Sequence, residues 1–300
     1  MMFGFRDKFD YVECTRCGCV QIQDVPADLS KYYPDEYYSF KKLEYPPGNF
    51  ISSFIRRQRA NYCLYQQGIL GKLFAMKLGI PDYYGWLTKA KVRFESNILE
   101  VGCGAGNLLR VLAREGFSNL IGVDPYINKD ISYDSGVRIL KKDVQELKGD
   151  FDFIMMHHSF EHMPDSHLMM RELYRLLKPG RFALVRIPIA SSYAWKKYGV
   201  NWVQLDPPRH LYLHTVKSMQ ILADESGFKL TDVVYDSFDF QFWGSEQYIR
   251  DIPLNDKKSY QVDPSNSIFS NDEIQKFREK AVELNKSKDG DQASFYLYKE

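Results

Sequence analysis

The residue types best suited to chemistry gather in the stretch ILEVGCGAGN, residues 98–107. Three glycines, Gly102, Gly104 and Gly106, stand at alternate positions directly after an apolar run. Because glycine has no Cβ, such a turn lets backbone N–H groups approach a ligand closely, and a helix that starts there favours negative charge. The stretch therefore predicts a nucleotide-binding turn, and the kind of nucleotide decides the function.

Two carboxylates accompany this turn. Glu100 lies two residues before the first glycine, and Asp124 ends the apolar stretch IGVD, where its two oxygens can accept both hydroxyls of a ribose. A dinucleotide turn has the spacing G-x-G-x-x-G, but this chain has Asn107 at the third of those positions. The spacing argues against NAD, and a dinucleotide oxidoreductase remains only an alternative.

Histidines supply the candidates for proton transfer. All six lie between His157 and His214. A hydroxyl group that attacks an electrophile must lose its proton, and a neutral imidazole is suited to accept it. His162 and His210 are the predicted bases, and a structural hydrogen-bonding role is the alternative for each.

A metal site is a second interpretation of the same histidines. His158, Glu161 and His162 have the i, i+3 and i+4 spacing that places side chains on one face of a helical turn, so they could share an ion. We assign no metal to the chain and keep this trio as an alternative.

Alternating strand and helix patterns position these residues. Such alternation predicts an α/β fold in which helices cover both faces of a parallel sheet, with ligands at the carboxyl ends of the strands. Strands are expected at 97–101, 119–123, 137–141, 151–156, 182–187, 230–235 and 293–299, and helices at 107–115, 166–177, 217–226 and 271–285.

Three parts of the chain are expected. Residues 1–45 form a cysteine-containing appendage that ends at the break Pro46-Pro47-Gly48, and residues 46–91 read as a helical lid segment. Residues 92–300 form the main domain, with an insertion at about 236–270. The aromatic-rich segments 50–87 and 238–268 are expected to cover the site of the second substrate.

The pattern E-x-G-x-G-x-G resembles the first motif of class I S-adenosylmethionine-dependent methyltransferases, and the match extends over about 95–235. The resemblance implies a Rossmann-like sheet with an antiparallel last strand and S-adenosylmethionine as cofactor, with Glu100 near its methionine end. The cofactor-binding residues that it implies are Glu100, Gly102, Gly104, Gly106, Asn107, Asp124, Pro125, Tyr126, Asp143, Val144 and His157.

A narrower resemblance rests on WVQLDPPRHLYLHT (202–215) and NKSKDGDQASFYLYK (285–299). These stretches are similar to a bacterial branch of methyltransferases often found among glycan and secondary-metabolite enzymes. The branch implies O-methylation of a sugar, nucleotide sugar or glycan. The alternatives are a small phenolic or quinone-like acceptor, or a binding module without turnover.

Members of that branch commonly carry an amino-terminal zinc-binding segment with two Cys-x-x-Cys pairs. This chain has Cys14-x-x-Cys17 and then Cys19, half of the pattern, so the appendage is expected to be only partly zinc-ribbon-like. The trio His158, Glu161 and His162 is also similar to the metal-bearing turn of some quinone O-methyltransferases, whose first ligand is acidic.

Composition limits the partners. The 300 residues include 40 basic and 39 acidic residues, so no global field would attract nucleic acid, and Arg56, Arg57 and Arg59 read as a solvated helix face. No apolar run approaches the length of a membrane span, and no secretory pattern is present. We expect a cytoplasmic enzyme with a small-molecule or glycan acceptor; the oligomeric state is not indicated.

Overall fold

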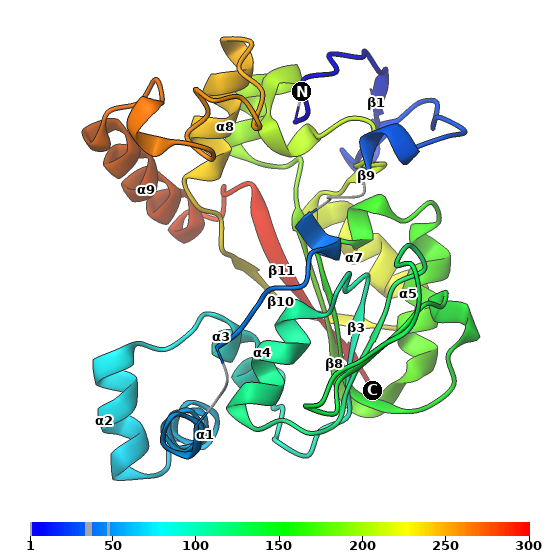
Figure 1. Cartoon of the computed structure of the whole chain (residues 1–300). Coiled ribbons are helices and arrows are strands. Elements are labelled where there is room, and N and C mark those ends of the chain that lie inside the picture. The colour runs from blue at the N-terminus through cyan, green and yellow to red at the C-terminus, as the bar shows by residue number, and fades with distance from the viewer. Residues whose placement is uncertain (1, 34–37, 47–48) are drawn as a thin grey trace.

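A computed structural model describes residues 2–33, 38–46 and 49–300 of the protein, and its centre is an eight-stranded sheet (Figure 1). The strands lie in the order β10-β11-β8-β7-β3-β4-β6-β5. Their bounds are β3 (Ile98–Val101), β4 (Leu120–Val123), β5 (Ile131–Ser132), β6 (Arg138–Leu140), β7 (Phe151–His157), β8 (Leu177–Pro188), β10 (Lys229–Tyr235) and β11 (Gln292–Lys299).

Most neighbouring strands of the sheet are parallel. β3 pairs in parallel with β4 and β7, and β8 pairs in parallel with β7, whereas β11 runs antiparallel between β8 and β10. The predicted sheet with its antiparallel last strand is confirmed. The two-residue strand β5 was not predicted, because two residues are too few for a periodic pattern.

Helices surround this sheet. They are α1 (Phe50–Tyr65), α2 (Ile69–Leu78), α3 (Tyr83–Lys89), α4 (Asn107–Glu115), α5 (Ser166–Leu176), α6 (Tyr193–Tyr198), α7 (Val216–Glu225), α8 (Phe240–Ile249) and α9 (Asn271–Lys286). Capping boxes begin several of them, as Thr215 and Ser218 do for α7. Among the residues described, no helix has the length and apolar character that crossing a membrane requires.

Two apolar cores lie on opposite faces of the sheet. Successive strand residues point to opposite faces, and Ile98 belongs to the core that contains Leu109 of α4, whereas Leu99 belongs to the core that contains Leu173 of α5. Tyr296 and Phe295 of β11 divide between the two cores in the same way. Burial on both faces explains why the central strands are continuously apolar.

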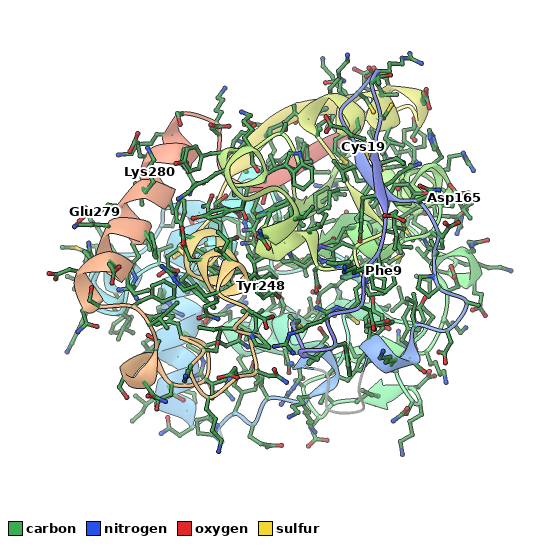
Figure 2. All side chains as sticks on the ribbon, turned by 90° about the horizontal axis from the view of Figure 1, so that it is seen from above. Phe9, Cys19, Asp165, Tyr248, Glu279 and Lys280 are labelled. Carbon is green, nitrogen blue, oxygen red and sulfur yellow. The ribbon has the colours of Figure 1, made fainter. Side chains whose placement is uncertain are left out.

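The amino-terminal appendage is joined to the main domain through a small sheet. β1 (Tyr11–Glu13) pairs with β2 (Val20–Ile22), and β2 pairs with β9 (Tyr212–Leu213), all antiparallel. Figure 2 shows Cys19, in the appendage, on the right of the molecule, and Glu279 and Lys280 of α9 on the left. The appendage is therefore held beside the segment that carries His210.

Residues 39–46, which we call the strap, run along α4. The amide oxygen of Asn107 accepts a hydrogen bond from the Leu43 N–H at 3.0 Å, and its amide nitrogen donates to the Lys41 carbonyl at 2.9 Å. Arg110 donates to the Leu43 carbonyl at 2.7 Å. Of the predicted break after the appendage, Pro47 and Gly48 lie outside the described residues.

The arginines of α1 are not the solvated face that the sequence suggested. Arg59 pairs with buried Glu115 at 2.8 Å, and Arg57 donates to the Gly116 carbonyl at 2.7 Å. Arg56 points to the same end of α4. These side chains attach α1 to the main domain. The sequence alone does not show that Glu115 is buried and binds Arg59.

Candidate active site

The glycine turn between β3 and α4 has the backbone that only glycine adopts without strain. Gly102, Gly104 and Gly106 have φ values of 71°, 53° and 71°. A Cβ on Gly104 would lie 2.2 Å from the carbonyl oxygen of Ser39, which accepts a hydrogen bond from the Ala105 N–H at 2.9 Å. In the structure the strap contacts the turn closely, and the approach of a nucleotide to it stays a prediction.

Asp124 follows β4 and lies against this turn. Its Oδ2 accepts a hydrogen bond from the Gly104 N–H and its Oδ1 accepts one from the Tyr126 N–H, each at 2.9 Å. The carboxyl group is buried, and burial raises its pKa. Each oxygen retains acceptor capacity, so the side chain can fix the turn and also bind the two hydroxyls of a ribose.

Replacing Asp124 with Asn should weaken binding of S-adenosylmethionine by about 10- to 100-fold, because one charge-assisted acceptor is lost, which costs about 1.5–3 kcal/mol. Isothermal titration measures the change. The matched control is Asp134→Asn, a change of an exposed carboxylate in the loop before β6, which should leave the affinity unchanged. A folded Asp124→Asn protein with wild-type affinity would refute the assignment.

Glu100 of β3 has a buried carboxyl group whose Oε2 has no hydrogen-bond partner among the described residues. Burial, with a smaller contribution from the charge of Asp124, raises its pKa to about 8. The group is therefore mostly protonated at pH 7. A ligand cation beside it would favour the carboxylate, so this unpartnered atom fits the ammonium group at the methionine end of the cofactor.

Cofactor binding should consequently release a proton from Glu100 near pH 7. The pKa of about 8 must fall toward its ordinary value of 4.5 when a cation arrives, so release should be largest between these values and small below pH 4. Titrations in buffers of different ionisation enthalpy measure the protons released. Glu100→Gln should abolish the release, and release that persists in this variant would exclude Glu100 as its source.

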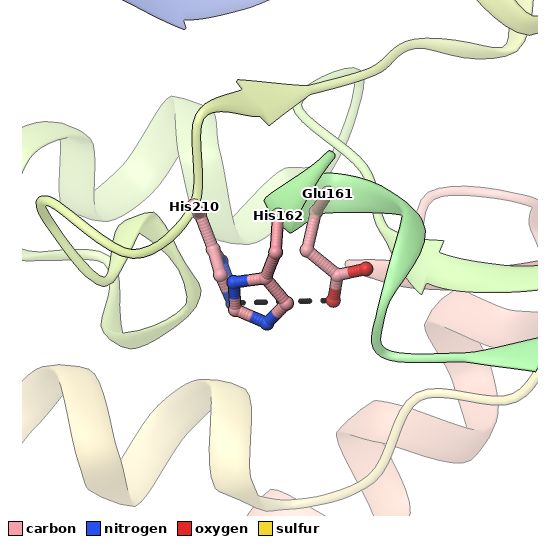
Figure 3. Close-up of side chains that lie close together, drawn as sticks. All are labelled: Glu161, His162 and His210. Carbon is pink, nitrogen blue, oxygen red and sulfur yellow. Dashed lines mark ion pairs between the residues drawn. The ribbon is translucent and has the colours of Figure 1, made fainter. Parts of the chain in front are cut away.

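The two predicted bases, His162 and His210, lie close together in the structure. His162 ends the short helix η4 (Phe160–His162) after β7, and the loop that carries His210 is held there because the Leu211 N–H donates to the Glu161 carbonyl at 2.8 Å. The two imidazole rings lie 4.8 Å apart, edge to face. Figure 3 shows both rings beside the carboxyl group of Glu161.

Backbone carbonyls determine which ring nitrogen is protonated. Nδ1 of His162 lies 2.8 Å from the Arg209 carbonyl oxygen, and Nδ1 of His210 lies 2.7 Å from the Gln204 carbonyl oxygen. Since a carbonyl oxygen can only accept, both Nδ1 atoms must carry hydrogen. In the neutral rings, Nε2 is therefore the atom that can accept a proton.

The histidines surround a buried anion. Burial raises the pKa of Glu161, but the imidazole of His158, 3.5 Å from Oε1, and the charges of the other nearby histidines outweigh it and lower that pKa to about 2. Burial, with the charge of His162, lowers the pKa of His210 to about 4. At neutral pH the carboxyl group of Glu161 is ionised and the ring of His210 is neutral.

The donor atoms that come together differ from the trio in the metal alternative. One ligand atom each from Glu161, His162 and His210 lies within 4.8 Å of the others. His158 instead approaches a guanidinium nitrogen of Arg186 at 2.8 Å. Two imidazoles whose Nδ1 atoms are anchored, together with a carboxylate, form a set of ligands that could hold a divalent cation. The metal site therefore stays an alternative interpretation, with His210 in place of His158.

A cavity of ≈ 990 Å³ adjoins the glycine turn and the histidines. Residues of the glycine turn, of the loop after β4 and of the appendage line the cavity, and His162 is the histidine among them. The lining residues are Pro26, Ala27, Leu29, Ser30, Tyr33, Phe40, Ala105, Tyr126, Ile127, Asn128, Lys129, Ile131 and His162. None of these residues comes from 50–87 or 238–268. The cover on this cavity is formed by the appendage, and no pattern in the sequence predicts that the appendage folds over the edge of the sheet.

Comparison with known proteins identifies the fold. Residues 79–233, about half of the chain, match the family model described as a methyltransferase domain. The chain belongs to the methyltransferase-domain family. It is an S-adenosylmethionine-dependent methyltransferase, and the glycine turn with Asp124 and Glu100 fits that cofactor.

Named relatives of this methyltransferase include ubiquinone biosynthesis O-methyltransferases. That of Pseudomonas aeruginosa (strain UCBPP-PA14) is 27% identical over 173 residues, which cover 51% of this chain and 73% of the relative. That of Erwinia tasmaniensis is 31% identical over 127 residues, covering 38% and 52%. A solved structure of mycolic acid cyclopropane synthase CmaA1 is similar with a TM-score of 0.47 and 15% identity, covering 83% of this chain and 95% of that one.

Several predicted cofactor residues of the methyltransferase have other partners in the structure. Asp143 is exposed and caps a 3-10 turn through the Gln145 N–H at 3.1 Å, with Val144 buried behind it. The ring of His157 packs on Trp86 at 4.4 Å, and Asn107 holds the strap. Exposed Pro125 lies just before Tyr126, which lines the cavity. Cofactor roles for these residues remain predictions.

The cysteines of the methyltransferase do not assemble into a three-ligand group among the described residues. Backbone N–H groups of Cys17 and Arg16 lower the pKa of Cys14, whereas burial raises the pKa of Cys19 to about 12. The Cys19 sulfur lies 3.8 Å from Nδ1 of His214. Zinc in the appendage stays a prediction.

Proposed function

We propose that this methyltransferase transfers the methyl group to a hydroxyl oxygen of a small molecule, with His162 as the base that takes the hydroxyl proton. The observation that carries the proposal is the placement of His162: it lines the cavity beside the glycine turn, and the Arg209 carbonyl holds its Nδ1–H so that Nε2 is the accepting atom.

The transfer balances with the groups present. S-adenosylmethionine supplies the methyl group, and its sulfur leaves as a neutral thioether. The acceptor oxygen forms the new bond to the methyl carbon as the carbon–sulfur bond breaks, and the hydroxyl proton moves to Nε2 of His162. The turn and Asp124 hold the cofactor in line with the acceptor, and such alignment supplies much of the rate.

His210 supports His162 in this proposal and does not contact the acceptor. It is buried, does not line the cavity, and its low pKa of about 4 makes it a weak base. Its ring packs against His162, and a carboxylate oxygen of ionised Glu161 lies within 4.8 Å of a nitrogen of each ring. The carboxylate can stabilise the imidazolium that forms when His162 takes the proton.

A flat phenolic or quinone-like acceptor has the better support. Aromatic and apolar side chains predominate around the cavity, among them Tyr33, Phe40, Tyr126, Ile127 and Ile131. Relatives are named ubiquinone biosynthesis O-methyltransferases, which is consistent with this class. The sugar, nucleotide sugar or glycan acceptor inferred from residues 202–215 stays a prediction, and no observation on the cavity favours it.

A paired acceptor panel tests the proposal. The protein is incubated with S-adenosylmethionine labelled in the methyl group and with catechols and hydroxyquinols, each paired with its fully methylated ether, and with simple sugars and nucleotide sugars. Label should enter a free phenol and not its methyl ether. Transfer confined to the sugars would overturn the phenolic assignment, and transfer to amines alone would overturn O-methylation.

A further inference from the structure

The outer face of the α1–α2 hairpin carries a cluster of exposed apolar side chains. α2 packs against α1 through small residues: Gly71 is buried, and a Cβ there would lie 2.2 Å from the Gln58 carbonyl oxygen. The other face of α2 is left to solvent. We call the following residues the hairpin patch: Phe50, Ile51, Phe54, Ile69, Leu70, Leu73, Met76, Leu78 and Ile80.

Several apolar side chains of the hairpin patch are almost fully exposed to solvent. Phe50 is 85% exposed, Ile69 82% and Met76 75%. A contiguous apolar surface of this kind marks a site that contacts another phase or molecule. Figure 1 shows α2 at the periphery of the molecule, with α1 between it and α4, so the patch faces away from the sheet.

Charge around the patch is of one sign. Residues 45–81 contain Arg56, Arg57, Arg59, Lys72 and Lys77 and no aspartate or glutamate, although the whole chain has nearly equal numbers of acids and bases. Arg56, Arg57 and Arg59 contact the end of α4, where Arg59 pairs with Glu115, so the cations beside the patch are the two lysines of α2. Lys72 and Lys77 stand exposed on α2 among the apolar side chains.

We propose that the hairpin patch docks on an anionic phospholipid surface. An amphipathic helix with lysines beside its apolar face lies in the membrane interface, where apolar side chains enter the acyl boundary and the cations meet anionic headgroups. The helices are too short and too polar to span the bilayer, so the contact is interfacial.

A second copy of the chain fits this face less well. Lys72 and Lys77 stand exposed on α2 beside the apolar side chains of the patch. A symmetric contact would bring the lysines of one α2 toward those of the other. A bilayer surface instead supplies the opposite charge.

Vesicle flotation with the full chain tests the proposal. The protein should float with phosphatidylglycerol vesicles at least about tenfold more than with phosphatidylcholine vesicles at low salt, and raised salt should reduce the difference. The double variant Leu73→Glu/Met76→Glu should lose flotation. Its matched control, Val262→Glu/Val282→Glu, places the same charges at exposed apolar positions elsewhere and should float like the wild type.

A variant that still binds S-adenosylmethionine is folded. Measuring this binding does not require that the methyl acceptor is known. Failure of the wild type to float with anionic vesicles would overturn the proposal. Flotation that survives Leu73→Glu/Met76→Glu would remove the hairpin patch as its cause. A dimer in light scattering that this double variant dissociates, without vesicle binding, would assign the face to a second copy of the chain.

Discussion

Replacing His162 with Gln is expected to lower turnover by ~10²–10⁴-fold while the affinity for S-adenosylmethionine changes by no more than a few fold. Gln keeps a similar size but offers no atom that can accept a proton at neutral pH. The glycine turn and Asp124, which we expect to bind the cofactor, are joined by a hydrogen bond in which His162 takes no part. Single-turnover rates at saturating cofactor, together with titration of the cofactor, measure both quantities.

Two further histidine variants sharpen this test. His167→Gln changes an exposed histidine that pairs with the exposed Glu225 at 3.2 Å, so it should retain full turnover. His210→Gln should reduce turnover less than His162→Gln does, because His210 does not reach the cavity. If His210 were the base, activity would persist down to its pKa of about 4, so activity already lost well above that pH excludes it.

A single methyl group on Gly104 should reduce cofactor affinity by about 100-fold or more. In Gly104→Ala the new Cβ would collide with the Ser39 carbonyl at 2.2 Å, so the turn or the strap must move. Movement of the turn removes the N–H that Gly104 donates to Asp124, a charge-assisted bond of up to ~3 kcal/mol, or about two decades of affinity. Titration of the cofactor measures the loss.

Gly136→Ala is the control for backbone strain. Gly136 also has a positive φ, 85°, but nothing lies within 4 Å of the Cβ position. Each Ala should lower the free energy of unfolding by ~1–2 kcal/mol because of its left-handed backbone, but only Gly104→Ala should lose the cofactor. Equal cofactor affinity in the two variants would show that contact at Gly104 does not shape the site.

The sheet could be predicted from sequence because its local signals agree. Strands such as β3 and β7 are buried on both faces and therefore read as short continuous apolar runs, and α4 buries Leu109 and Leu112 on one stripe. The helix α8 was missed: almost all of its faces are buried, among them Phe242, Trp243 and Tyr248, so it shows no periodic polar side.

The site was predictable only where a motif fixes the geometry. The turn and Asp124 each follow a predicted parallel strand, so the pattern placed both at the same edge of the sheet, whereas the hydrogen bond between them was not predicted. The cover by Tyr33 and Phe40 and the approach of His210 to His162 depend on tertiary contacts between distant segments. Spacing along the chain selected His158 for the metal alternative, and His158 does lie 3.5 Å from Glu161, but the group of three ligand atoms is completed by His210, which comes from a distant segment.

The atom that receives the methyl group tests the account most directly. The protein is incubated with a phenolic acceptor and S-adenosylmethionine carrying ¹³C in its methyl group, and nuclear magnetic resonance follows the label. The account predicts a methyl ether and one equivalent of demethylated cofactor per ether, with the rate collapsing in His162→Gln. Label appearing on carbon or nitrogen, or an ether formed equally fast by His162→Gln, would contradict it.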